Sequence, residues 1–142
     1  TASLGDDPLA VSLSSPWDVL WSTALNKVVV AMAGVHQIFS FDPANGQVAV
    51  LAGTGLEGLQ DGEATAAWFA QSSGLAQDAN GSIWIADSET SALRVISFPE
   101  VKGSERVQVQ TAIGTGLFLG AGGRLNAAGR ASGPRPRAGV TT

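Results

Sequence analysis

The chain has 142 residues, of which 44% are hydrophobic and 14% charged, so it is long enough for one folded domain and too apolar for a disordered acidic chain. Twelve acidic residues against eight basic ones give a net charge of −4, which argues against nucleic acid as a partner. No apolar run approaches the roughly 20 residues of a membrane span, so we expect no membrane insertion. The absence of cysteine excludes disulfides, thiolate metal sites and thiol redox chemistry within these residues.

Two copies of one sequence unit fill most of the chain. The apolar run Val28–Ala31 recurs 55 residues later as Ile83–Ala86, and each copy ends on Gly-Thr-Gly, at 53–55 and 114–116. Turn residues bound the short apolar runs of both copies. The pattern predicts four strands per copy, near residues 17–21, 27–32, 37–41 and 47–52, and near residues 73–77, 82–87, 92–98 and 106–113.

Between the copies, residues 63–71 are rich in alanine and predict one or two helical turns. Self-similarity at this period, with several short strands per copy, is typical of a propeller-type array. We therefore expect an all-β fold, namely a partial β-propeller of about two four-stranded antiparallel blades. The expected divisions are the end of a preceding inter-blade segment (1–16), a blade with its inter-blade loop (17–71), a second blade (72–119) and a tail (120–142).

The tail differs in composition from the rest of the chain. It carries four of the eight basic residues and no acidic one, and it consists largely of Gly, Ala, Arg and Pro. A flexible linker is the favoured interpretation, because an arm that binds nucleic acid would need aromatic residues for stacking. A third interpretation is non-native sequence from a shifted reading frame, since the repeat stops after Gly116.

Three segments resemble NHL repeats and occur in the same order as in that family. They are Ser15–Val19, Ala31–Ile38 and Ala86–Arg94. The Gly-Thr-Gly tripeptide, Asp61-Gly62 and Trp68–Gln71 resemble the inter-blade segment of NHL propellers that are fused to thioredoxin-like domains, and the resemblance covers roughly residues 5–119. It implies a ring of six blades, of which this chain holds two.

The resemblance implies a non-enzymatic scaffold whose loops bind a protein partner, a ligand or another domain of the same parent chain. The chain lacks an initiator methionine, so we expect a piece of a longer thioredoxin-like/NHL protein. For a plant or algal source the resemblance implies the thylakoid lumen, and otherwise we expect the cytoplasm. Because these residues include no cysteine, no redox activity is carried over.

The candidate binding residues are those expected at loop tips on the rigid blades. They are Trp17, Asp18, His36, Gln37, Glu89 and Thr90. Trp17, beside Asp18 at the start of a strand, is the one expected nearest a binding face. His36 is the single histidine, so we interpret it as a hydrogen-bonded loop residue in preference to a metal ligand or base.

Other candidate residues are expected to be structural. Asp87 and Arg94 flank a hairpin that a charge-assisted bond would brace. The glycines of the two tripeptides are expected in inter-blade turns; they are Gly53, Gly55, Gly114 and Gly116.

Two motifs superficially suggest ligand chemistry. Residues 53–58 fit G-x-G-x-x-G, but a dinucleotide loop must open a helix, so an inter-blade turn is favoured. Residues 42–46 and 78–81 lack the alternating oxygen ligands of a calcium loop and are interpreted as simple turns.

The competing hypothesis is part of a propeller lyase or hydrolase with a metal in the central channel. Such a site needs channel-facing histidines or acids from several blades, and this chain offers at most His36, Asp18 and Asp87. We therefore predict no catalytic residue, metal site or cofactor within these residues, and fold alone does not decide the function.

Two blades leave an apolar face uncovered at each end, because each repeat is stabilised by its neighbours. At ~25 cal/mol per Å², several hundred Å² left in water forfeits roughly 10 kcal/mol, which is comparable to the stability of a whole domain. We therefore expect the isolated chain to self-associate or to be only marginally folded.

Overall fold

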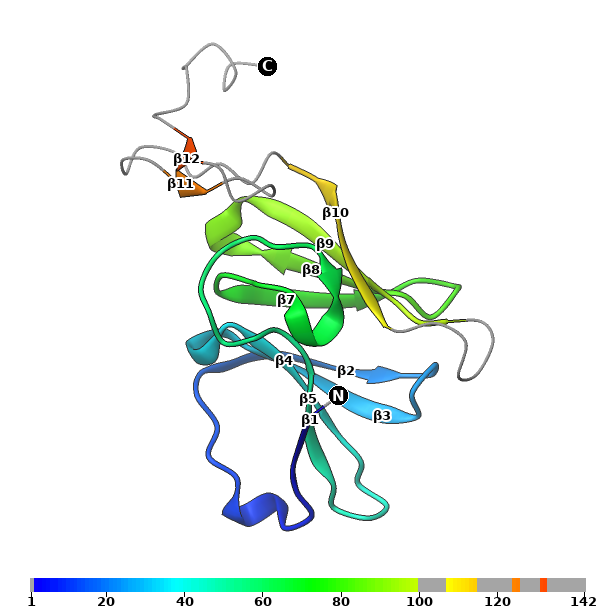
Figure 1. The fold of residues 1–142 in the computed structure, drawn as a ribbon. Helices are drawn as coiled ribbons and strands as arrows, with labels where there is room; N and C mark the ends of the chain where they lie inside the picture. The colour runs from blue at the N-terminus through cyan, green and yellow to red at the C-terminus, as the bar shows by residue number, and fades with distance from the viewer. Residues whose placement is uncertain (1, 100–106, 115–123, 126–130, 133–142) are drawn as a thin grey trace.

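Two antiparallel β-sheets of five strands lie one above the other and make up most of the molecule (Figure 1). The structure is a computed structural model that describes residues 2–99, 107–114, 124–125 and 131–132. Its helices within these ranges are four single turns of 3-10 type, so the predicted all-β fold is confirmed. None of the helices in these ranges is long and apolar enough to cross a membrane.

The first sheet, here called the first blade, has the strand order β1-β5-β4-β3-β2. Hairpins connect its four core strands, and two 3-10 turns flank them, η1 (Pro8–Ala10) before β2 and η2 (Ala33–Val35) between β3 and β4. The strands are β1 (Ala2–Gly5), β2 (Pro16–Ser22), β3 (Lys27–Met32), β4 (Gln37–Phe41) and β5 (Val48–Ala52).

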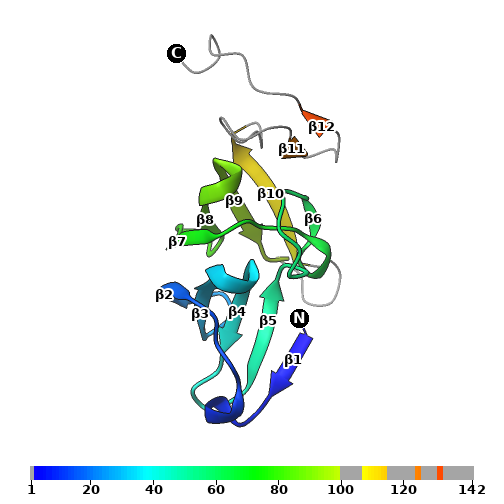
Figure 2. The same cartoon turned by 90° about the vertical axis from the view of Figure 1, so that its left-hand side faces the viewer.

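The second sheet, the second blade, repeats this order as β6-β10-β9-β8-β7 (Figure 2). Its 3-10 turns are η3 (Ala64–Ala66) before β7 and η4 (Ser88–Thr90) between β8 and β9. The strands are β6 (Gly62–Glu63), β7 (Ser72–Gln77), β8 (Ile83–Asp87), β9 (Ala92–Ser97) and β10 (Gln108–Ile113).

The eight predicted strands are all present, with ends within two residues of the expected ones where the structure describes them. Each sheet nevertheless has a fifth strand that we did not predict. β1 pairs with β5, and β6 pairs with β10, so the chain before each blade adds an edge strand to that blade. Within the tail, β11 (Arg124–Leu125) and β12 (Ala131–Ser132) form an antiparallel pair where we expected a linker.

The backbone conformation also repeats. Ser15 and Gln71 have φ of 52° and 51°; they directly precede β2 and β7, and each of these strands contains a bulge. His36 and Ser91 have φ of 56° and 53°; they end the 3-10 turns that lead into β4 and β9. Non-glycine residues with positive φ are uncommon, so their recurrence shows that the two copies fold alike.

Each blade has two faces, which we name by their place at the junction of the blades. Face A of the first blade packs against face B of the second, and this junction, the joint, holds the main hydrophobic core. Strand pairing puts Leu20, Val29, Ala31, Ile38 and Ala52 on face A of the first blade, and Ile83, Ile85, Ile96 and Val109 on face B of the second.

The inter-blade segment, residues 57–71, completes the joint. Its Ala64, Ala67 and Phe69 belong to the same buried cluster. A second, smaller cluster lies on face B of the first blade, away from the joint; its buried members are Met32, Phe39, Val48 and Val50. Apolar side chains are therefore buried on both faces of the first blade.

Candidate functional site

The candidate binding residues come from the end of the blades where η2, η4 and the inter-blade segment lie. Asp18 connects the innermost strands of the two blades at this end. Its Oδ2 accepts a hydrogen bond from the backbone N–H of Leu75 at 2.7 Å, and its Oδ1 accepts one from Val19 at 2.8 Å. At the opposite end of the same strands, Oε1 of Gln77 accepts bonds from the backbone N and the hydroxyl of Thr23 at 2.8 and 3.1 Å. The inner edge of the joint is therefore fastened at both ends.

His36 and Gln37 are half-buried; His36 bonds to the inter-blade segment, and Gln37 bonds to the end of its own blade. Nδ1 of His36 accepts a bond from the backbone N–H of Gln71 at 3.1 Å, which assigns the neutral ring proton to Nε2. That Nε2 lies 3.8 Å from Oε2 of Glu57. Nε2 of Gln37 donates to the carbonyl of Gly53 at 3.1 Å and so anchors the first Gly-Thr-Gly turn.

Arg94 is fully buried in the joint and donates four hydrogen bonds. Its Nη1 bonds to the carbonyl of Trp68 at 2.8 Å and to Oδ2 of Asp87 at 3.0 Å. Its Nη2 bonds to the carbonyl of Gln60 at 3.0 Å and to Oδ1 of Asp61 at 2.9 Å. Nε has no hydrogen-bond partner among the described residues, and the guanidinium carbon lies 4.8 Å from the centre of the Phe69 ring. Arg94 thereby ties the inter-blade segment to the second blade.

Asp87 accepts four hydrogen bonds and is equally buried. The donors are the backbone N–H of Ala70, the hydroxyls of Ser72 and Thr90, and Nη1 of Arg94. Burial raises the pKa of the Asp87 carboxyl above its ordinary value, in opposition to these four donors. Asp87 and Arg94, which we expected to brace a hairpin, form an ion pair that also reaches the preceding segment.

Asp61 is a residue of this network that we did not single out. Its carboxylate accepts bonds from Arg94 and from both the backbone N–H and the hydroxyl of Thr111, at 2.9 Å each. Its partners lie 33 and 50 residues away in the sequence, so no local pattern shows the pairing. The available signal was the Asp-Gly pair of the inter-blade motif.

The structure separates the six candidate binding residues by accessibility. Thr90, which we expected at an accessible tip, is fully buried, and its hydroxyl donates to Oδ2 of Asp87 at 2.7 Å. That expectation is wrong, because η4 turns the side chain inward. Glu89 is half-buried, and its backbone N–H donates to the carbonyl of Ala70. Trp17 is 52% exposed and is the exposed one of the six.

The tripeptide glycines take the expected turn conformation. Gly53, Gly55 and Gly114 have φ of 100°, 95° and 110°, whereas Gly116 lies outside the described residues. A Cβ on Gly53 would come within 2.8 Å of the His36 carbonyl oxygen, and one on Gly114 within 2.6 Å of the Ser91 carbonyl oxygen. Both tripeptides therefore need glycine for a close approach of backbone to backbone.

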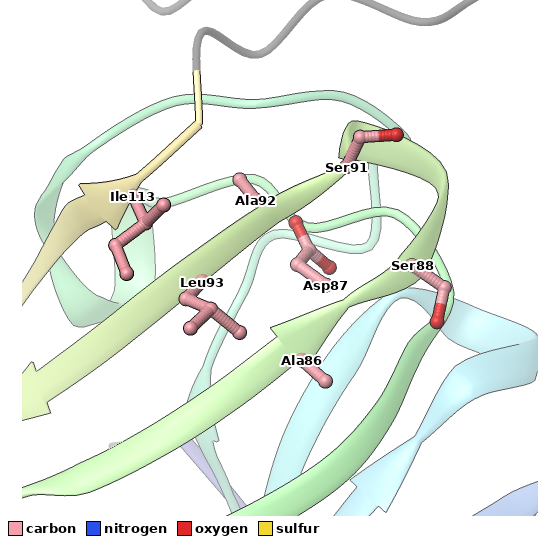
Figure 3. Close-up of a pocket in the computed structure, with 7 residues that line it drawn as sticks. All are labelled: Ala86, Asp87, Ser88, Ser91, Ala92, Leu93 and Ile113. Carbon is pink, nitrogen blue, oxygen red and sulfur yellow. The ribbon is translucent and has the colours of Figure 1, made fainter. Parts of the chain in front are cut away.

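A hollow of about 250 Å³ lies on face A of the second blade, at its η4 end (Figure 3). Its lining is mostly apolar, with Leu93 and Ile113 paired across neighbouring strands. Asp87 is the one acidic residue among the described residues that line it, and both oxygens of that carboxylate are already hydrogen-bonded. Among the residues that the structure describes, no three His, Asp or Glu side chains gather in a way that could hold a metal ion. The hollow is suited to an apolar side chain.

The chain is similar to one curated protein and to part of a solved structure, while no family model matches it. It is 38% identical over 86 residues to the protein SUPPRESSOR OF QUENCHING 1, chloroplastic, from Arabidopsis thaliana; the match covers 59% of this chain and 8% of that protein. A structural genomics protein of unknown function from Bacteroides thetaiotaomicron has a similar fold, with a TM-score of 0.55 and 21% identity over 66% of this chain and 22% of that one. The chain thus spans a small part of each relative.

Proposed function

We propose that this chain is two blades of an NHL-type propeller and acts as a non-enzymatic interaction scaffold. The proposal rests on the hydrogen bonds that the polar candidate residues make within the protein. Asp18 and His36 bond to backbone groups across the joint, and Gln37 bonds to the carbonyl of Gly53 within the first blade, so all three are engaged in holding the structure together. Trp17 remains 52% exposed on this rigid support. An exposed tryptophan on a fixed strand is well suited to anchor a protein partner.

The scaffold would form part of a larger protein with a thioredoxin-like domain. The similarity to the Arabidopsis protein supports a longer parent, since the match covers 8% of that chain, and the thioredoxin-like domain is carried over from the resemblance to NHL fusion proteins. The name of that protein places it in the chloroplast, and we extend this location to the present chain for a plant or algal source. The expected partner is another domain of the same parent chain or a separate protein.

The test uses the remainder of the parent chain, produced as a separate protein and titrated into the 142-residue chain by calorimetry. Binding should be saturable, and Trp17→Ala should weaken it about tenfold, as expected for an aromatic anchor. Leu56→Ala is the matched control, because Leu56 is also exposed but lies in the loop after β5. Equal affinities of the two variants, or no binding at all, would contradict the proposal.

The competing enzyme hypothesis is tested by metal analysis and turnover of the full-length parent. Its candidate ligands from this chain are Asp18, His36 and Asp87, and each already accepts hydrogen bonds from protein groups. Stoichiometric calcium or zinc, with an activity that is lost on chelation, would support the lyase or hydrolase and overturn the scaffold proposal.

A further inference from the structure

Face A of the second blade repeats a surface that is buried in the first. Leu93 and Ile113 occupy the repeat positions of Ile38 and Ala52, as their strand pairing shows. Ile38 and Ala52 are completely buried in the joint, whereas Leu93 and Ile113 are 37% and 62% exposed. Leu93 and Ile113 both line the hollow of Figure 3. Face A of the second blade thus has the residues of a surface that packs against another blade, but no described residue covers it.

The internal joint shows what covers such a surface. The inter-blade segment crosses face A of the first blade and inserts Phe69 into the cluster that contains Ile38 and Ala52. Backbone bonds fix this segment: the N–H groups of Gly53 and Thr54 donate to the carbonyls of Ala64 and Ala67, at 2.8 and 3.0 Å. Face B of the following blade then closes the joint.

The opposite end of the molecule has a surface that could cover face A of the second blade. The N-terminal segment, residues 2–15, follows the inter-blade segment in its construction, since β1 and η1 repeat β6 and η3. The carbonyls of Ser14 and Ser15 accept bonds from Gly34 and Ala33 at 3.0 Å. The carbonyls of Ala70 and Gln71 accept the equivalent bonds from Glu89 and Ser88, at 3.1 and 3.4 Å.

The N-terminal segment therefore lies on face B of the first blade as the inter-blade segment lies on face B of the second. In this arrangement Leu13 takes the place of Phe69, but it is 57% exposed. Beneath it is a hollow of about 230 Å³ with a mostly apolar lining that includes Met32 and Phe39.

We propose that these ends bind each other between two copies of the chain, in a head-to-tail joint. Face A of the second blade of one copy receives the N-terminal segment and face B of the first blade of the next, with Leu13 seated between Leu93 and Ile113. This association is heterologous, so it continues into a closed ring or an open polymer. In a longer propeller parent the neighbouring blades would cover the same two faces, so the proposal concerns the 142-residue chain by itself and is tested apart from the scaffold partner.

Sedimentation velocity of the full 142-residue chain over a range of concentrations tests this arrangement. The wild-type chain should associate reversibly. Ile113→Asp and Leu13→Asp should each weaken association more than tenfold, because each puts a carboxylate into an apolar contact. Leu56→Asp, at a residue that is 56% exposed and on neither end face, should leave it unchanged. Circular dichroism checks that the variants fold, and Leu93→Asp replaces Ile113→Asp if that variant does not.

The decisive experiment mixes the Ile113→Asp and Leu13→Asp variants. Ile113→Asp keeps an intact first blade, and Leu13→Asp keeps an intact second blade, so the mixture should form a heterodimer although each variant alone is monomeric. A wild-type monomer, continued association of either variant alone, or a mixture that stays monomeric would overturn the head-to-tail joint. The second of these results would indicate a symmetric contact through one face.

Discussion

Met32 and Asp87 end equivalent strands of the two blades, 55 residues apart, and both are completely enclosed on face B. Met32 packs in an apolar cluster with Phe39 and Val50. Asp87 instead forms an ion pair with Arg94, which stands at the repeat position of Phe39. One repeat position is thus filled by apolar packing in the first blade and by a charged network in the second. The loss of one residue should therefore affect the free energy of unfolding differently in the apolar cluster and in the charged network.

Removal of Arg94 alone should be strongly destabilising. Arg94→Met leaves the Asp87 carboxylate buried without its cation and takes the donor from the carbonyls of Gln60 and Trp68. We expect the free energy of unfolding to fall by about 3–5 kcal/mol, the usual cost of breaking a buried pair. Urea denaturation measures this loss. Lys27→Met, which removes a half-buried cation at the start of β3, is the control and should change stability by less than about 1 kcal/mol.

Replacing the charged network of the second blade by the apolar residues of the first blade should restore most of the stability that Arg94→Met loses. The variant Asp87→Met, Arg94→Phe, Thr111→Val copies Met32, Phe39 and Val50 of the first blade. Asp61 loses the side-chain donors of Arg94 and Thr111 but keeps the backbone N–H of residue 111, and its side chain is 34% exposed and can be hydrated. Buried ion pairs are often replaced by packed apolar groups at little cost, so we expect this variant to be at least about 2 kcal/mol more stable than Arg94→Met. The same urea series measures it, and a triple variant less stable than Arg94→Met would contradict the equivalence of the two positions.

The pH dependence of stability should show the burial of Asp87. Because its pKa is raised, the folded protein holds the proton of this carboxyl more tightly than the unfolded chain does. The contribution of Asp87 to stability is therefore fully present below its ordinary pKa of 3.8 and is lost as pH rises through the folded pKa. In denaturation curves at successive pH values, the stability of the wild type relative to Asp87→Asn should decline over this acidic window. An increase with pH would mean that the Arg94 charge outweighs burial.

The strands could be predicted from sequence because hairpin turns and apolar runs are local signals. The edge strands could not: β6 has two residues, Gly62–Glu63, which is too short to show alternation, and its pairing with β10 is set by the path of the inter-blade segment. The roles of the site residues were harder to predict, for the same reason. His36 bonds to a backbone group 35 residues away and Asp18 to one 57 residues away, so both look like free loop residues until the blades are stacked.

The bond from Leu75 to Asp18 should set the rigidity of the joint at its inner edge. In Asp18→Asn one carboxylate oxygen becomes an amide donor, so the side chain cannot accept from both Leu75 and Val19. We expect a loss of about 1–3 kcal/mol and faster hydrogen exchange of the Leu75 amide. Asp42→Asn, in a turn within the first blade, is the control and should leave that amide unchanged. Unaltered exchange at Leu75 in Asp18→Asn would show that apolar packing alone holds the blades.

The first Gly-Thr-Gly turn should tolerate no side chain at its first position, and the chain offers a control that separates strain from clash. Gly53 and Gly5 both have positive φ, 100° and 120°, so alanine is strained at either place. A Cβ on Gly5 meets nothing within 4 Å, whereas one on Gly53 meets the His36 carbonyl at 2.8 Å. Thermal and urea unfolding should therefore show Gly53→Ala to be less stable than Gly5→Ala by about 1–3 kcal/mol, the range expected for overpacking. If both variants lose the same stability, the turn moves away from η2 without cost, and close contact between these backbones is not what the glycine provides.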